Sequence, residues 1–318
     1  MELPSLAEIE DAARIVYAHM APTAQYRWPL LAEAAGADLW LKHENHTPVG
    51  AFKLRGGLVY FSRLKNVPGV IAATRGNHGQ SVAWCAREHG VPCTIVVPHG
   101  NSVEKNAAMR SFGARLIEHG HDFQAAYEHA VELAERERLH MVPSFERTLI
   151  AGVATASLEL FGAVPDVQTV YVPIGLGSGI CGAIAVRNAV GSRAEIVGVV
   201  SAHAPAYARS FAERRPIDAD VSTRIADGMA VRKPDPRALE LICRHAARIV
   251  EVTDDEVARA IALIFQCTHN CAEGAGAAPV AAILKERSRL AGRKVAAVLS
   301  GGNIDRAVFA EVLANHEG

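Results

Sequence analysis

Residues 169–201 of the chain read TVYVPIGLGSGICGAIAVRNAVGSRAEIVGVVS. An apolar, β-branched run at 169–175 leads through a glycine-rich turn into a helical pattern at 180–189, and a second such run follows at 195–201. Two strands joined by a helix are typical of a βαβ crossover, in which the strands lie parallel and the helix covers one face of the sheet. This stretch therefore predicts an α/β fold built on a parallel sheet.

The same alternation of apolar runs and helical patterns extends over the rest of the chain. Further predicted strands lie at 38–42, 69–74, 92–98, 114–119, 248–253 and 294–302, and further helical patterns at 80–87, 123–137, 254–265 and 277–290. Thr253 and Glu256 have the spacing of a capping box, which predicts a helix that begins just after Thr253. We expect mainly parallel sheets with helices on both faces, which is a three-layer α/β architecture.

The predicted strands fall into two groups, which indicates two domains. One group lies between about 69 and 119, and the other lies after residue 169 together with one early strand. At roughly 150 residues per domain, 318 residues are enough for two. Because the second group encloses the first in sequence, we predict a large domain formed by 1–65 and 144–318, and a small α/β domain inserted at 66–143.

Composition and charge exclude several classes of protein. The 33 Lys and Arg residues balance 34 Asp and Glu residues to a formal net charge of −1, whereas nucleic-acid binding requires a basic excess or stripe. The longest apolar stretches have about 5–8 residues, well below the roughly 20 that a membrane helix needs. The N-terminus carries early acidic residues and lacks a signal-peptide pattern. We expect a cytoplasmic protein with no nucleic-acid and no membrane partner.

The six cysteines show neither a disulfide framework nor a metal pattern. Most lie in apolar contexts, where a free cysteine behaves as a small hydrophobe. Only Cys267, His269 and Cys271 lie close together, and no second Cys/His pair accompanies them at the spacing of a zinc site. We expect no metal site.

A lysine beside an aromatic residue and glycines is the first candidate for chemistry. The stretch 51–56 reads Ala-Phe-Lys-Leu-Arg-Gly, with Lys53 at the start of a helical pattern. Burial near the positive end of a helix lowers the pKa of a lysine, and its neutral amine can then form a Schiff base. When this segment is considered alone, a solvated surface lysine is the favoured interpretation, because that is the commonest environment of a lysine.

Two polar turns follow other predicted strands, at the edge of the sheet where ligands of α/β proteins collect. At the first turn, the N–H groups of a new helix can hold a carboxylate or a phenolate. At the second turn, Ser300 offers one neutral hydroxyl. Both turns are also compatible with simple helix caps. The first turn consists of Thr74, Arg75, Gly76, Asn77 and His78.

The glycine-rich turn of the opening stretch fits a phosphate group. It joins a buried strand to a helix, which is what a backbone phosphate cradle requires. A dinucleotide site is the alternative, but its acidic residue would end the next strand, whereas Glu195 opens that strand. No Gly-Lys-Ser/Thr sequence follows, which excludes the common nucleoside-triphosphate loop. The turn consists of Gly175, Leu176, Gly177, Ser178 and Gly179.

Together the four segments suit pyridoxal 5'-phosphate, which needs an amine, a phosphate site and a partner for its ring nitrogen. In these segments the chain resembles the fold-type II pyridoxal-phosphate enzymes (tryptophan synthase β-like), and within them the serine/threonine dehydratase and serine racemase branch. The resemblance covers nearly the whole chain and keeps the order of the motifs. The matching stretches are 51–56, 74–78, 175–179, 225–231 (Ile-Ala-Asp-Gly-Met-Ala-Val), 273–278 (Glu-Gly-Ala-Gly-Ala-Ala) and 300–303 (Ser-Gly-Gly-Asn).

The resemblance implies a role for each segment, with the cofactor in the cleft between the two domains. Lys53 would hold the cofactor as a Schiff base and act as the catalytic base, with Phe52 packed beside the ring. Asn77 would bond the ring hydroxyl, and the turn at 175–179 would hold the phosphate. Ser300 would be the second catalytic residue and would face the ring nitrogen, where a neutral hydroxyl favours loss of a β-leaving group over a long-lived carbanion. The turn at 74–78 would bind the substrate carboxylate.

Three departures from the family pattern carry expectations of their own. Arg75 stands where racemases use a serine and dehydratases a small residue, and it would either bind an acidic substrate side chain or anchor the turn by an ion pair. The stretch 201–212 has no carboxylate for the Mg²⁺ or Ca²⁺ that some relatives bind. The few residues after Asn303 leave no room for the regulatory domain of biosynthetic threonine deaminases, so we expect no isoleucine feedback through such a domain.

The activity implied is that of a pyridoxal-phosphate-dependent dehydratase/ammonia-lyase in amino-acid metabolism. Its substrate would be a β-hydroxy-α-amino acid of the threonine, serine, 3-hydroxyaspartate or phenylserine type, and its product a 2-oxo acid. A racemase or a β-replacement enzyme on the same fold is the alternative chemistry. A nucleotide-dependent oxidoreductase or a cofactor-binding protein without turnover is less favoured. Because fold-type II enzymes are commonly dimers, a homodimer is expected.

Overall fold

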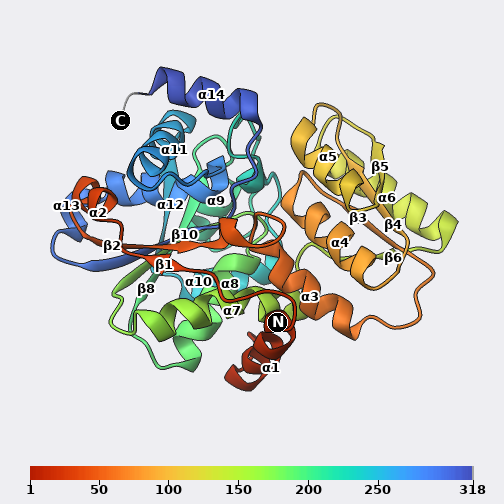
Figure 1. Ribbon diagram of the computed structural model, residues 1–318, viewed down its shortest axis with the longest axis horizontal. Helices are drawn as coiled ribbons and strands as arrows, with labels where there is room; N and C mark the ends of the chain where they lie inside the picture. Colours follow the sequence, from red (N-terminus) through yellow and green to blue (C-terminus); the bar gives the residue numbers. More distant parts are fainter. Residues whose placement is uncertain (317–318) are drawn as a thin grey trace.

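The computed structural model describes residues 1–316, and two sheets organise it (Figure 1). The larger sheet has six strands in the order β1-β2-β10-β7-β8-β9, and the smaller has four in the order β5-β4-β3-β6. Every pairing is parallel except that of β1 with β2. The strands are β1 (Gln25–Tyr26), β2 (Asp38–His43), β3 (Val70–Ala73), β4 (Cys93–Val97), β5 (Arg115–Glu118), β6 (His140–Met141), β7 (Thr169–Pro173), β8 (Glu195–Ser201), β9 (Arg248–Val252) and β10 (Lys294–Leu299).

Helices cover both faces of each sheet, so the predicted α/β architecture with mainly parallel sheets is confirmed. Helices α2, α11, α12 and α14 pack on one face of the larger sheet, and α7, α8 and α10 pack on the other. The helices are α1 (Leu6–Tyr17), α2 (Pro29–Ala35), α3 (Lys53–Arg63), α4 (Asn77–Glu88), α5 (Val103–Ser111), α6 (Phe123–Glu137), α7 (Arg147–Ala163), α8 (Ser178–Ala189), α9 (Ala206–Glu213), α10 (Pro236–His245), α11 (Asp254–Thr268), α12 (Gly274–Lys285), α13 (Arg287–Leu290) and α14 (Arg306–Asn315).

Most of the elements lie where the sequence predicts them, and the differences have local causes. The capping box is present, since the Thr253 hydroxyl accepts from the Glu256 N–H and the Glu256 carboxylate accepts from the Thr253 N–H. Strands β1 and β6 were not predicted, because each has only two residues and therefore shows no periodicity. The prediction of a single helix at 277–290 is wrong, because α12 ends at Lys285 with Glu286 as its C-cap, and a separate helix, α13, begins at Arg287.

The smaller sheet and its helices lie at the right of Figure 1, and the six-stranded sheet lies at the left. All four strands of the smaller sheet fall within 66–143. Its core also contains apolar side chains of α1 and α3, including Val16 and Leu58, so α3 joins the two sheets physically. The division into 1–65 with 144–318 and an inserted 66–143 stays a prediction, and its last two residues lie outside the described part.

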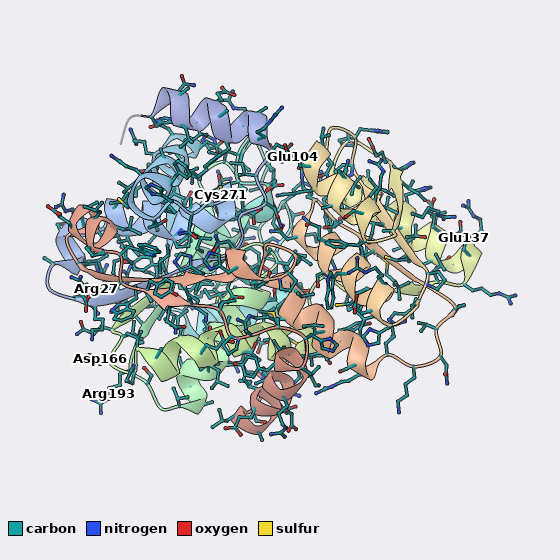
Figure 2. All side chains as sticks on the ribbon, viewed as in Figure 1. Arg27, Glu104, Glu137, Asp166, Arg193 and Cys271 are labelled. Atoms are coloured by element: carbon teal, nitrogen blue, oxygen red, sulfur yellow. The ribbon has the colours of Figure 1, made fainter. Side chains whose placement is uncertain are left out.

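Side chains fill the layers between sheets and helices (Figure 2). Charged residues such as Arg27, Glu137 and Arg193 are exposed at the periphery. In the part of the chain that the structure describes, we find no helix with both the length and the apolar character required to span a membrane.

Candidate active site

One cavity of about 580 Å³ collects the sequence-predicted site residues. It lies beyond the carboxyl ends of β3, β7 and β10, where two sheets contribute the walls. Side chains far apart in sequence thus face one space, as expected for the ligand site of an α/β fold. The predicted residues that line the cavity are Phe52, Lys53, Thr74, Arg75, Gly76, Asn77, His78, Gly175, Leu176, Gly177, Ser178, Gly179 and Ser300.

Lys53 is the first residue of α3, and its ammonium lies inside this cavity. Lys53 Nζ donates a hydrogen bond to Ser178 Oγ at 3.0 Å and lies 5.2 Å from the centre of the Phe52 ring. Burial of the ammonium lowers the pKa of Lys53 to about 8. Near neutral pH a much larger share of this amine is therefore uncharged than in an ordinary lysine, and the uncharged form is the one that acts as a nucleophile or a base.

Backbone pairing places Ser300 beside Lys53. The Phe52 N–H donates to the Ser300 carbonyl at 3.0 Å, and Ala51 forms an antiparallel bridge with Gly301. Ser300 is 4% exposed and lines the cavity just after β10 ends. The two residues predicted to be catalytic therefore occupy neighbouring positions in the wall.

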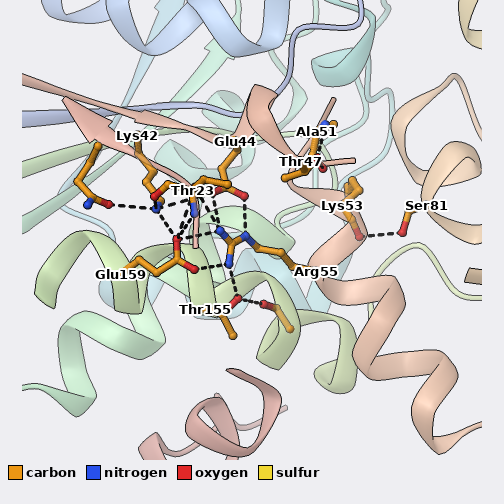
Figure 3. Close-up of polar contacts among 12 residues, drawn as sticks. Thr23, Lys42, Glu44, Thr47, Ala51, Lys53, Arg55, Ser81, Thr155 and Glu159 are labelled. Carbon is orange, nitrogen blue, oxygen red and sulfur yellow. Dashed lines mark hydrogen bonds and ion pairs between the residues drawn. The ribbon is translucent and has the colours of Figure 1, made fainter. Parts of the chain in front are cut away.

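A buried ion-pair network anchors the first turn of α3 (Figure 3). Arg55 Nε donates to Glu44 Oε2 at 2.7 Å, and its Nη1 donates to Glu159 Oε1 at 2.6 Å. Lys42 Nζ also donates to Glu159, at 2.5 Å, so two positive and two negative side chains balance. Removing any one partner would leave an uncompensated buried charge, so the four side chains are held together. The network thereby fixes Arg55, and with it Lys53, which lies two residues earlier.

The turn at 175–179 has the geometry of an anion cradle. Gly177 has a φ of +101°, and a Cβ there would lie 2.8 Å from the Ala238 side chain. A Cβ on Gly175 would lie 2.5 Å from the Gly228 carbonyl oxygen. α8 begins at Ser178, and its first residues line the cavity. The N–H groups of a first helical turn have no partner within the helix, so this position favours a phosphate.

These features fit pyridoxal phosphate as a set. A buried amine of lowered pKa, an anion cradle, and the Ser300 hydroxyl share one cavity. The amine is suited to the aldehyde, the cradle to the phosphate, and a neutral hydroxyl to a ring nitrogen. The role of each of these residues stays a prediction.

A second buried charge cluster, to which the sequence analysis assigned no role, supports Asn77. Lys105 Nζ lies 2.7 Å from Asp227 Oδ2 and 2.9 Å from Glu273 Oε2. Asn77 Nδ2 donates to Glu273 Oε1, and Asn303 Nδ2 donates to Asn77 Oδ1 at 2.9 Å. The Asn77 amide is thus oriented from both sides, with one of its two N–H groups still available to a ligand.

The charges of this cluster depend on one another. Burial raises the pKa of the Glu273 carboxyl, and Lys105 counteracts that rise. Burial alone would lower the pKa of Lys105, but Glu273 and Asp227 outweigh it and hold that pKa above its usual value. Asp227 and Glu273 lie in stretches that carry the family resemblance, so a signal for them existed. Lys105 lies inside α5, outside the stretches that carry the resemblance, and has no such signal.

The turn at 74–78 is shaped by one threonine hydroxyl. Thr74 Oγ1 accepts hydrogen bonds from the Gly76 N–H at 2.9 Å and the Gly79 N–H at 3.2 Å. Burial lowers the pKa of His78 to about 3, so this imidazole is neutral at physiological pH. Among residues 1–316, Arg75 makes no ion pair and no hydrogen bond, so the expected alternative in which it anchors the turn through an ion pair is not found.

The segment with Cys267, His269 and Cys271 does not line this cavity. His269 ends α11 and stacks on Phe265, whereas Cys271 is exposed. Within residues 1–316 no group of three or more His, Cys, Asp or Glu side chains has the arrangement of a metal site.

Comparison with known proteins places the chain in a family. A family model described as pyridoxal-phosphate dependent enzyme matches residues 16–301. The chain is 35% identical to an L-threonine ammonia-lyase of Thermotoga maritima over 95% of its own length and 76% of the relative. It is 36% identical to an L-threonine ammonia-lyase of Geobacter sulfurreducens over 86% of its length and 69% of the relative.

A solved structure agrees with the sequence comparison. The crystal structure of a threonine deaminase from T.th. superposes with a TM-score of 0.89 at 30% identity, covering 95% of this chain and 99% of that one. The predicted cofactor class and fold type are therefore confirmed. The chain belongs to the family of pyridoxal-phosphate-dependent enzymes, as a fold-type II member of the threonine dehydratase and serine racemase group.

Proposed function

We propose that the chain is a carbon–oxygen lyase that converts a β-hydroxy-α-amino acid into a 2-oxo acid and ammonia. One observation carries the proposal: Lys53, of lowered pKa, faces a cavity onto which the first turns of two helices open. The start of α8 suits a phosphate, and the start of α4 suits a substrate carboxylate. The relatives named as L-threonine ammonia-lyases support the same reaction class.

Different residues of the chain carry out different parts of the reaction. Pyridoxal phosphate supplies the electron sink that stabilises negative charge at the substrate α-carbon. The turn at 74–78 holds the α-carboxylate, which fixes the α-carbon near Lys53. The uncharged Lys53 Nζ takes up the α-proton, and its pKa of about 8 suits a general base at neutral pH. Asn77, fixed by Glu273 and Asn303, orients the bound ring.

The reaction balances without a further reactant. Loss of the α-proton and of the β-hydroxyl breaks the C–O bond and releases one water. The resulting enamine tautomerises, takes up one water and releases ammonia. The net change is the loss of ammonia and formation of a 2-oxo acid.

The alternative activities differ in how well the site fits them. Racemisation requires an acid on the face of the substrate opposite Lys53, and Arg75 stands where racemases of this family place a serine. The interpretation of the chain as a nucleotide-dependent oxidoreductase is wrong, because the chain belongs to a family of pyridoxal-phosphate-dependent enzymes. A cofactor-binding protein without turnover is distinguished by an assay of products.

The test measures 2-oxo acid and ammonia released from a panel of β-hydroxy amino acids in both stereochemistries. We expect equal amounts of the two products from at least one member. Conversion of an amino acid to its mirror image without ammonia release would establish racemisation instead. Protein that carries the visible absorbance of bound cofactor but releases nothing from the whole panel would contradict the proposal.

We further propose that the enzyme is a cytoplasmic homodimer. All six cysteines are free thiols in the structure, which suits a reducing compartment. Light scattering coupled to size-exclusion chromatography tests the homodimer by measuring the mass in solution, which is compared with the 33.9 kDa of one chain. A mass near that of one chain at working concentration would rule it out.

A further inference from the structure

Arg75 lines the cavity and has no partner among residues 1–316. It lies in the turn between β3 and α4, directly before Gly76 and Asn77. Its Nε is buried and donates no hydrogen bond, and no carboxylate of residues 1–316 lies within ion-pair distance of the guanidinium. A buried donor that has lost water without gaining a partner costs free energy, so an unpaired buried group in a folded protein requires an explanation.

Four carboxylates line the same cavity as Arg75, none of them within ion-pair distance of it, and three of the four already have a cation of their own. Asp122 pairs with Arg232 at 3.2 Å, and Asp227 and Glu273 share Lys105. Asp220, which also lines the cavity, is exposed to solvent. Residues 1–316 therefore supply no anion for Arg75, and its guanidinium remains available to a ligand.

Two of the anions that the proposed reaction brings to the cavity have other sites. The cofactor phosphate is matched by the turn at 175–179 and the start of α8. The substrate α-carboxylate is matched by the N–H groups at the start of α4. Arg75 is left for a third anion, and its place beside the turn at 74–78 puts that anion next to the α-carboxylate.

We propose that Arg75 binds a carboxylate on the substrate side chain, and that the substrate is an acidic β-hydroxy-α-amino acid of the 3-hydroxyaspartate class. In such a molecule the two carboxylates sit on adjacent carbons, which matches an arginine adjacent to the α-carboxylate turn. A guanidinium fits a carboxylate through two parallel hydrogen bonds, which a serine or threonine substrate could not accept. This inference rests on the proposed function, and the product would be a 2-oxo diacid with ammonia.

The first experiment measures kcat/KM for 3-hydroxyaspartate and for serine in the same preparations. We expect the intact protein to prefer the acidic substrate and Arg75→Ala to lower the ratio of the two values about ten- to a hundredfold, as loss of a charge-assisted hydrogen bond implies. Arg75→Lys should lower it less, because the charge stays and the paired hydrogen bonds are lost.

Arg232→Ala is the matched control, since it removes one positive charge from the same cavity where that charge already has a partner. An equal fall in the ratio in Arg232→Ala would show that the overall field, rather than a contact at Arg75, selects the substrate. If Arg75→Ala lowered kcat/KM equally for both substrates, Arg75 would be assigned to the α-carboxylate instead. A preference of the intact protein for serine would likewise overturn the proposal.

The second experiment measures binding without turnover, so that the two proposals can fail separately. α-Methylaspartate and 2-aminoisobutyrate lack an α-proton, and their binding is followed by the change in the visible absorbance of the bound cofactor. We expect α-methylaspartate to bind more tightly, and Arg75→Ala to remove that difference. If Arg75→Ala removes that difference while no hydroxy amino acid releases ammonia, the lyase proposal is contradicted and the Arg75 site is supported. If ammonia is released but α-methylaspartate has no advantage, the Arg75 site falls and the lyase stands.

Discussion

Lys53 Nζ and Ser178 Oγ lie 3.0 Å apart across the cavity, although 125 residues separate them in the chain. Each is the first residue of a helix, so the positive ends of two helix dipoles face the same space. That arrangement disfavours a further positive charge and agrees with the lowered pKa of the Lys53 ammonium. The same two helix ends attract an anion, so one geometry prepares both a neutral amine and a phosphate site.

The first prediction concerns the pH dependence of cofactor attachment. Burial lowers the pKa of Lys53 from 10.5 to about 8, and only the neutral amine is a nucleophile. The rate at which protein freed of cofactor regains visible absorbance from added pyridoxal phosphate should rise with pH and level off above about pH 8. A rate that keeps rising to about pH 10, the usual range of a lysine, would show an amine with an ordinary pKa.

The second prediction is that Lys53→Ala abolishes both the visible absorbance of the lysine-bound cofactor and turnover. The reason is that no other amine among residues 1–316 takes the same place between Phe52 and Ser178. Absorbance spectra and assays of 2-oxo acid measure the two losses. Lys65→Ala, which replaces an exposed lysine beyond the end of α3, should change neither. Retained absorbance and turnover in Lys53→Ala would refute the role assigned to this residue.

The third prediction is that Gly177→Ala weakens cofactor binding. Its φ of +101° is unfavourable for alanine, and the added Cβ would come within 2.8 Å of Ala238, so the turn must shift. The dissociation constant for pyridoxal phosphate should increase at least tenfold, as measured by equilibrium dialysis.

Gly191→Ala is the matched control for backbone strain. Gly191 has a φ of +66°, and a Cβ there would meet nothing within 4 Å. This variant should lose about 1 kcal/mol of stability, the usual cost of alanine at positive φ, while its cofactor affinity stays that of the unchanged protein. Equal loss of affinity in both variants would mean that strain in the fold, rather than the shape of the cradle, is responsible.

The fourth prediction concerns the cluster of Lys105, Asp227 and Glu273. Lys105→Met leaves the Glu273 carboxylate buried without its cation, which should destabilise the protein by about 3–5 kcal/mol in urea unfolding. Lys105→Met with Glu273→Gln removes the uncompensated charge and should recover much of that loss. If the double variant is no more stable than the single one, the charge of Glu273 is not the cause.

The stability of the Lys105→Met variant should also depend on pH in a defined direction. Burial raises the pKa of Glu273 above 4.5, and without Lys105 it rises further. The folded state then binds a proton more strongly than the unfolded state, so stability is lost as pH rises from about 4.5 through that raised pKa. The difference between Lys105→Met and the unchanged protein should therefore shrink in acid. A difference that grows toward low pH would contradict this assignment.

The sequence alone determined the fold class and the main chemical groups, because those signals are local. Apolar runs of strand length alternate with helical periods. The glycine turn at 175–179 leads into α8, which begins at Ser178, two residues before the predicted start at 180. The Ala-Phe-Lys stretch at 51–53 singled out Lys53 for the same reason. Two-residue strands such as β1 and β6 carry no period, so they escaped notice.

Only the tertiary structure decided which charges are paired. Lys105, Asp227 and Glu273 are distant in sequence, and nothing in the sequence near Lys105 indicates that it is buried between two carboxylates. Arg75 is the opposite case, a charge for which the sequence left an ion pair and an acidic ligand equally open. Whether a charge is satisfied depends on what surrounds it in space, and the described part of the folded chain surrounds Arg75 with no available carboxylate.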